Sequence, residues 1–262
     1  MNKFSLIGYI ISAVLVIILS LPGNPVIGQN PEPIEKKIFI YGGGLNQAFL
    51  EYIAQLTGKV KPKICYLPTA AADNPYAINR WYQLCSGLNV EPHTLRVWIN
   101  SPNQKESWKD VLDKMDAIVV GGGNTLNMIA IWKAQEIDLA LKYVYEKGAV
   151  LAGGSAGSLC WFEGGTTDSR PKELTIVKGL GFLNYSHCPH YNSEEARRPL
   201  YHENILTGKL SDGYACDDNA GLLFVDGRLK NGVSMDENNN SYFVFKMGNK
   251  IVEEKIESRI LK

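Results

Sequence analysis

Short apolar runs alternate with segments whose apolar side chains recur at helical spacing over most of the chain. Between residues 47 and 56, for example, Phe49, Ile53 and Leu56 fall on one helical face, and Gly58 follows as a termination signal. Runs that end in glycine or proline are typical of buried strands. Strands are predicted at residues 37–41, 63–67, 93–98, 116–120 and 148–152, and helices at 47–56, 76–84, 108–115, 125–133 and 136–146.

This alternation of strands and helices predicts a mostly parallel sheet with helices on both faces. Further along, the pattern indicates a strand at residues 183–186 and a helix at 194–206. After about residue 210 it indicates strands alone, the last two joined by the hairpin signal Met247-Gly248-Asn249. We therefore expect an α/β fold with a C-terminal β-hairpin, in a single domain over residues 37–262. The late strands are predicted at 213–216, 221–225, 241–246 and 250–255.

The N-terminal 28 residues have a different pattern. Lys3 precedes an apolar run from residue 4 to residue 19, and Val26-Ile27-Gly28 offers a cleavage site. This predicts a signal peptide over residues 1–28, then a linker over 29–36 with two prolines, and a periplasmic or secreted protein. A retained anchor is the alternative, although the run is short for a membrane-spanning helix.

Composition and charge limit the kinds of partner, metal and cofactor that are expected. The 262 residues include 27 Lys and Arg and 27 Asp and Glu, so the net charge gives no reason to expect nucleic acid as a partner. The cysteines are odd in number and lack zinc-type spacing, so we expect buried thiols and no metal. No nucleotide motif accompanies the glycines, and no cofactor is expected. The cysteines are Cys65, Cys85, Cys160, Cys188 and Cys216.

Three glycine-rich turns follow predicted strands, at residues 42–44, 121–123 and 153–157. In parallel sheets ligands bind outside the carboxyl ends of the strands. The three turns therefore predict a single site along one edge of the sheet.

The last of these turns has the form G-x-S-x-G, with Ser155 at its centre. A sharp strand-to-helix turn holds such a serine in a strained conformation and exposes its hydroxyl, which is typical of a nucleophile. The alternative is a serine that only caps a helix. A nucleophilic serine also needs N–H donors for an oxyanion, and Ala156 with Gly122 or Gly123 are the candidates.

A serine nucleophile needs a base and a group that orients the base. His187 and His190 flank Cys188-Pro189 at the end of a predicted strand, and both are candidates for the base. For the acid we consider Asp168, in the polar segment 164–169 that we expect to form a turn. Glu163 and Glu173 are the alternatives.

Four motifs in this order, at residues 120–125, 154–157, 166–168 and 189–191, resemble those of the S51 serine peptidases. Dipeptidase E, the α-aspartyl dipeptidase, is the most similar type, and cyanophycinase is more distant. The resemblance implies a flavodoxin-like sheet related to class I glutamine amidotransferases, and no metal. It also implies a Ser155–His190–Asp168 triad, with Gly123 and Ala156 as oxyanion donors and Asn124 beside them.

The resemblance further implies that the substrate is a small peptide with an N-terminal aspartate. An aspartate side chain calls for a cation, and Arg197 and Arg198 follow His190 closely enough to supply one. We expect loops near Tyr191 and Arg198 to close the pocket. A cyanophycinase-like β-aspartyl hydrolase and a non-catalytic exported peptide-binding protein are the alternatives. Apart from the peptide, we consider a homodimer, and membrane contact only through an uncleaved signal segment.

Overall fold

The structure is a computed structural model that describes residues 34–261. The predicted signal peptide, residues 1–28, and residues 29–33 of the predicted linker lie outside the described residues. Within the described range no helix is long and apolar enough to cross a membrane.

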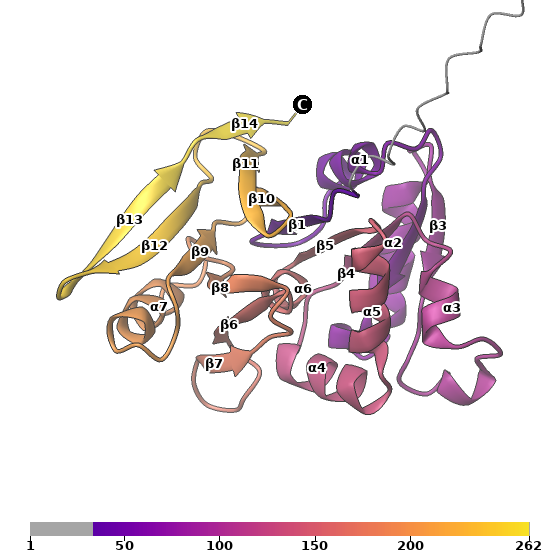
Figure 1. The fold of residues 1–262 in the computed structure, drawn as a ribbon, viewed down its shortest axis with the longest axis horizontal. Coiled ribbons are helices and arrows are strands. Elements are labelled where there is room, and N and C mark those ends of the chain that lie inside the picture. Colours follow the sequence, from indigo (N-terminus) through magenta and orange to yellow (C-terminus); the bar gives the residue numbers. More distant parts are fainter. Residues whose placement is uncertain (1–33, 262) are drawn as a thin grey trace, which may run out of the picture. The chain divides into compact units, whose positions relative to one another are not determined.

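The first half of the described chain alternates strands with helices, and the second half consists mostly of strands (Figure 1). The elements are β1 (Lys37–Tyr41), α1 (Gln47–Leu56), β2 (Lys63–Leu67), the short 3-10 helix η1 (Thr69–Ala71), α2 (Pro75–Cys85), β3 (Glu91–Thr94), the 3-10 helix η2 (Ser101–Asn103), α3 (Trp108–Leu112), β4 (Ala117–Val120), α4 (Thr125–Ala134), α5 (Ile137–Glu146), β5 (Val150–Gly154), α6 (Ala156–Leu159), β6 (Phe162–Thr167), β7 (Thr175–Lys178), β8 (Leu183–Cys188), α7 (Arg197–Leu206), β9 (Gly213–Cys216), β10 (Ala220–Val225), β11 (Arg228–Ser234), β12 (Ser241–Met247), β13 (Lys250–Ile256) and β14 (Ser258–Ile260).

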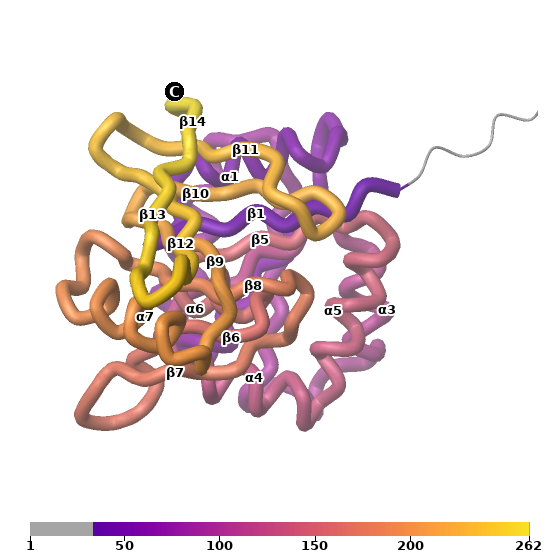
Figure 2. The backbone as a smooth tube through the Cα atoms, turned by 60° about the vertical axis from the view of Figure 1, so that its left-hand side comes forward, coloured from indigo at the N-terminus to yellow at the C-terminus, as the bar shows by residue number. Residues whose placement is uncertain are grey.

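The strands form two sheets. The first has the order β14-β11-β10-β1-β5-β4-β2-β3, and its five strands from β1 to β3 run parallel. Figure 2 shows β14, β11, β10, β1 and β5 side by side in this order. The second sheet has the order β13-β12-β9-β8-β6-β7, and β6, β8 and β9 run parallel at its centre.

Alternate residues of the first sheet enter two separate cores, because successive side chains of a strand point to opposite faces. Phe39 and Tyr41 pack with α1 and α2, whereas Ile38 and Ile40 pack with α3, α4, α5 and part of the second sheet. A sheet that is buried on both faces needs continuous apolar runs, which is the pattern seen in β1, β2 and β4. The predicted α/β fold with helices on both faces and a C-terminal hairpin is therefore confirmed.

Two local predictions need correction. The predicted third strand, 93–98, ends at Thr94, because the N–H groups of Val97 and Trp98 donate to the carboxylate of Asp73 and not to a neighbouring strand. The predicted polar turn at 164–169 is largely a strand, β6, which pairs on both sides with β7 and β8. The absence of a Cβ at Gly165 lets β8 approach, since a side chain there would collide with the carbonyl of His187.

Candidate active site

Ser155 occupies the turn between β5 and α6 with φ 57° and ψ −120°, a conformation that favours glycine. Two glycines of this turn lack side chains for a steric reason. A Cβ at Gly157 would collide with the carbonyl of Val120, and a Cβ at Gly153 would collide with the carbonyl of Gly157. The Ser155 side chain makes no capping hydrogen bond to α6. The structure therefore favours a strained, half-buried serine whose side chain is not used to cap the helix.

His190 lies in the turn after β8, with Nε2 2.9 Å from Ser155 Oγ and Nδ1 2.8 Å from Asp218 Oδ1. The carboxylate selects the tautomer with hydrogen on Nδ1, so that Nε2 accepts the hydrogen bond of the serine hydroxyl. This is the relationship that a serine nucleophile needs with its base and with the group that orients the base.

The acid in this arrangement is Asp218, which the sequence reasoning missed. Asp168 follows β6 and is 67 % exposed, and the cation near it is Arg197, at 3.8 Å. Of the two alternatives, Glu163 accepts a hydrogen bond from Ser211 and Glu173 is exposed. A usable signal was present in the sequence: an acidic turn, residues 217–219, follows the correctly predicted strand 213–216.

Asp218 is held in place by contacts with two neighbouring turns. Its backbone N–H donates to Asn192 Oδ1 at 3.0 Å, which links the turn after β9 to the turn that carries His190. Gly43, in the first glycine-rich turn, lies against the carboxylate, because a Cβ there would be 2.7 Å from Asp218 Oδ1. The glycine thus leaves room for the acid beside the carboxyl end of β1.

His187, the other candidate base, is fully buried, and neither of its ring nitrogens is hydrogen-bonded to Ser155 Oγ. Its Nδ1 lies 2.9 Å from the carbonyl oxygen of Tyr214, and its Nε2 lies 2.9 Å from Ser158 Oγ. Burial lowers the pKa of His187 to about 3, so the ring is neutral at ordinary pH. His187 therefore belongs to the packing beneath the turn.

The expected oxyanion donors differ in their availability. The N–H groups of Gly122, Gly123 and Ala156 make no hydrogen bond to any acceptor in the described part of the chain. Gly122 adjoins the nucleophile, since a Cβ there would be 3.4 Å from Ser155 Oγ. Asn124 is engaged elsewhere: its Oδ1 caps α4 and its Nδ2 donates to Ser169.

The arginines that we expected to bind substrate are both paired. Arg197 is only 3 % exposed and bonds to Glu194 and to the Thr166 carbonyl. Arg198 Nε donates to Glu253 at 2.7 Å, and its guanidinium lies over the ring of Tyr191. None of Arg197, Arg198 and Tyr191 lines the pocket beside Ser155. Arg198 of α7 and Tyr191 both bond to Glu253 of β13, whereas Arg197 joins α7 to β6 through the Thr166 carbonyl.

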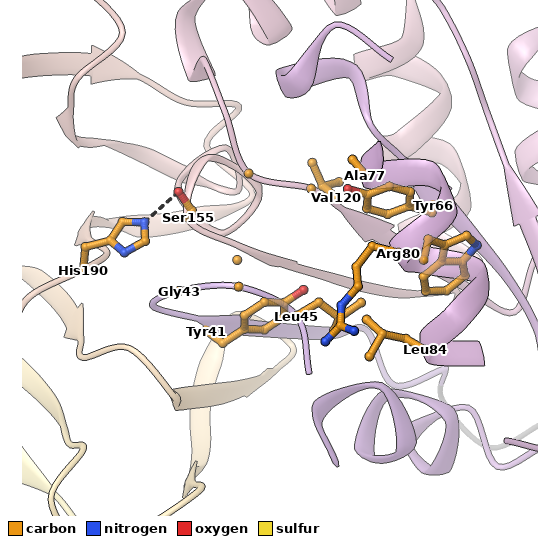
Figure 3. Close-up of a pocket in the computed structure, with 15 residues that line it drawn as sticks. Tyr41, Gly43, Leu45, Tyr66, Ala77, Arg80, Leu84, Val120, Ser155 and His190 are labelled. Carbon is orange, nitrogen blue, oxygen red and sulfur yellow. Dashed lines mark hydrogen bonds between the residues drawn. The ribbon is translucent and has the colours of Figure 1, made fainter. Parts of the chain in front are cut away.

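A pocket of about 400 Å³ opens beside Ser155 (Figure 3). Its walls come from the turns after β1, β4 and β5 and from α2. Among residues 34–261 no group of three or more His, Cys, Asp or Glu side chains is arranged to hold a metal ion. The five cysteines are buried and unpaired, as predicted. The pocket is lined by Tyr41, Gly43, Gly44, Leu45, Tyr66, Ala77, Arg80, Trp81, Leu84, Val120, Gly121, Gly122, Gly154, Ser155 and His190.

The fold and this site define an α/β protein with the constellation of a serine hydrolase. The chain belongs to peptidase family S51, whose sequence model matches residues 38–232. It is 39 % identical over 224 residues to an uncharacterised peptidase, YgaJ, of Bacillus subtilis (strain 168), a match that covers 83 % of this chain and 96 % of the relative.

Two solved structures share the fold at low sequence identity. A peptidase from an acI-B1 actinobacterium superposes with a TM-score of 0.67 at 16 % identity, covering 86 % of this chain and 96 % of that one. A candidate peptidase E of Listeria monocytogenes EGD-e gives a TM-score of 0.56 at 15 % identity, covering 85 % and 100 %. The predicted family and fold class are confirmed.

Proposed function

We propose that this S51 peptidase is a serine exopeptidase that hydrolyses small peptides through an acyl-enzyme on Ser155. The observation that carries the proposal is the continuous hydrogen-bond chain from Ser155 Oγ through His190 to Asp218, with links of 2.9 and 2.8 Å. The strained serine turn and the free N–H groups beside it supply the remaining parts of such a site.

In this mechanism the Ser155 hydroxyl attacks the peptide carbonyl while His190 Nε2 takes its proton. The Asp218 carboxylate stabilises the resulting imidazolium, and the N–H groups of Gly123 and Ala156 are the proposed donors to the oxyanion. His190 then gives the proton to the leaving amine as the C–N bond breaks. A water molecule, deprotonated by His190, hydrolyses the acyl-enzyme and restores the serine.

For the substrate we propose a dipeptide with an N-terminal aspartate. The resemblance to dipeptidase E supports this choice, and a pocket of about 400 Å³ suits a small ligand. A cyanophycinase-like enzyme is the second candidate. Release of arginine from a β-aspartyl linkage favours an acidic pocket, whereas this pocket is lined by an arginine and, among the described residues, by no carboxylate.

The test compares hydrolysis of Asp-Leu, Leu-Leu, β-Asp-Leu and a nitrophenyl ester by the parent protein and by Ser155→Ala. Cleavage of Asp-Leu that is lost in the variant supports the proposal, whereas preference for β-Asp-Leu favours the cyanophycinase-like activity. No cleavage by a folded protein whose Ser155 also fails to react with a fluorophosphonate supports the non-catalytic peptide-binding alternative.

The apolar run at residues 4–19 supports the further proposal that the enzyme acts outside the cytoplasm. Mass spectrometry of the protein recovered after expression with its own N-terminus tests this proposal. A mature chain that begins at Gln29 supports export with cleavage, and an intact chain in the cytoplasm contradicts it.

A further inference from the structure

One charged side chain besides the catalytic histidine lines the pocket at Ser155, within the described part of the chain. It is Arg80, which projects from α2 toward the pocket (Figure 3). No carboxylate in residues 34–261 lies within 4.0 Å of its guanidinium. Arg197 and Arg198 differ in this respect, because both are bound to glutamates.

Arg80 extends from a helix that is firmly attached to the core. Asn74 caps α2 by accepting from the N–H of Tyr76, and the adjacent Trp81 is 1 % exposed. The Trp81 ring stacks on Tyr66 of β2, with centroids 5.4 Å apart. The backbone of Arg80 is therefore fixed relative to the sheet that ends at the site, while its guanidinium is free to meet a ligand.

The walls around Arg80 also favour an anion. Tyr41 and Tyr66 line the pocket, and burial raises the pKa of both phenols, so they remain neutral hydrogen-bond donors. Neither hydroxyl has a side-chain hydrogen bond within the described residues. A guanidinium with two phenols, and no acid on the walls, matches the needs of a carboxylate.

The position of Arg80 relative to His190 indicates which part of the substrate it meets. Ser155 lies between the two side chains in Figure 3. His190 must protonate the leaving amine, so the leaving group lies on the histidine side of the scissile bond. The acyl residue then extends the other way, into the part of the pocket lined by Arg80.

We propose that Arg80 binds the side-chain carboxylate of the acyl residue of the substrate and so sets a preference for an N-terminal acidic residue. This inference rests on the proposed peptidase function of the same site. It assigns acidic specificity to α2, in place of the arginines of α7 that sequence reasoning suggested.

The test uses Asp-Leu and Asn-Leu, because aspartate and asparagine have the same shape and differ in charge. In the parent enzyme kcat/KM favours Asp-Leu. In Arg80→Gln the ratio of kcat/KM for Asp-Leu to kcat/KM for Asn-Leu falls by about 10- to 100-fold, which corresponds to the usual free energy of a hydrogen bond between charged groups. Arg80→Lys keeps part of this ratio. The matched control, Arg198→Gln, keeps the parent ratio. An unchanged ratio in Arg80→Gln, or a lost ratio in Arg198→Gln, overturns the proposal.

A second measurement separates this proposal from the proposed function. If the parent protein cleaves no dipeptide, a fluorophosphonate still reports Ser155 reactivity, and free aspartate serves as the competing anion. Protection of Ser155 by aspartate in the parent, lost in Arg80→Gln, supports Arg80 as the anion site even though the peptidase proposal has failed. Equal protection in both proteins, or none in either, overturns the role of Arg80. Thermal unfolding shows whether the variants are folded.

Discussion

Asp218 lies 2.8 Å from Nδ1 of His190, and the two residues occupy turns that follow neighbouring strands of the second sheet. Strand β8 ends at Cys188 and β9 at Cys216, and the two strands run parallel with Cys188 opposite Ala215. The carboxyl ends of parallel strands meet at one edge of a sheet, which places both turns together. Ser155 follows β5 of the first sheet, so the site joins the carboxyl ends of strands from both sheets.

Replacement of Asp218 by asparagine tests its role as the orienting acid. We expect Asp218→Asn to lower kcat by roughly 10⁴-fold, because an amide stabilises neither the required histidine tautomer nor the imidazolium. The matched control is Asp168→Asn, at an exposed carboxylate that does not contact His190. Steady-state kinetics on the best dipeptide provide the measurement. A large loss in the Asp168 variant with little change in the Asp218 variant would reverse the assignment.

The serine turn was predictable from sequence because its constraints are local. Gly153, Ser155 and Gly157 lie in one short segment, residues 153–157, and the clash that Gly153 avoids is with the Gly157 carbonyl of the same turn. Gly157 is different, because the carbonyl that excludes a side chain there belongs to Val120 of β4. The boundaries of β1, β2, α1 and β9 were likewise predicted correctly, since apolar runs and helical periodicity are properties of single segments.

The acid and the pocket arginine were not predicted, because they depend on which segments pair in space. Nothing local in the sequence indicates that the strand before His190 runs parallel to the strand before Asp218. The second sheet was missed for the same reason, and with it the strand character of the residues before Asp168. Arg80 resembles any solvated residue on a helix until the fold places α2 beside Ser155.

The positive φ of Ser155 predicts that replacing this residue by glycine stabilises the fold while it removes the activity. Ser155→Gly relieves a conformation that a residue with a Cβ adopts at a cost of about 1–3 kcal/mol, whereas Ser155→Ala keeps the strain. Both variants lack the nucleophile and lose turnover. We expect Ser155→Gly to unfold at a higher temperature than Ser155→Ala in calorimetry. If the alanine variant is equally or more stable, the strain at this position is small.

Two adjacent glycines should respond differently to a single added methyl group. Gly123 has φ 134°, and a Cβ there would collide with the Ala70 carbonyl, so Gly123→Ala should destabilise the fold by about 1–3 kcal/mol. At Gly122 the Cβ would be 3.1 Å from Ser155 Cβ and 3.4 Å from its Oγ. Gly122→Ala should therefore crowd the nucleophile and lower kcat while changing stability less.

Chemical denaturation and kinetics on the same two variants test this contrast. The result that contradicts it is full activity in Gly122→Ala, which would mean that substrate does not approach Ser155 from the Gly122 side. Unchanged stability in Gly123→Ala would likewise contradict the constraint from Ala70.

His187 predicts how the folded state responds to acid. Burial lowers the pKa of His187 from 6.5 to about 3, so below pH 6.5 the unfolded chain takes up a proton that the folded chain does not. Above pH 6.5 His187 is neutral in both states and its burial carries no cost from protonation. As the pH falls from 6.5 toward 3, protonation of the unfolded chain alone lowers the free energy of unfolding. The slope from this one proton is at most about 1.4 kcal/mol per pH unit.

Urea unfolding of the parent protein and of His187→Gln between pH 4 and pH 7 isolates this contribution, since the other titrating groups are shared. We expect the unfolding free energy of the parent to fall more steeply with acid than that of the variant. NMR of the imidazole carbons provides a readout that does not depend on the variant folding: the buried ring, held between Ser158 and the Tyr214 carbonyl, should keep its neutral shifts down to pH 4. Titration of His187 near pH 6.5 in the folded protein would show that water reaches the ring, and would contradict its place in the packing beneath the Ser155 turn.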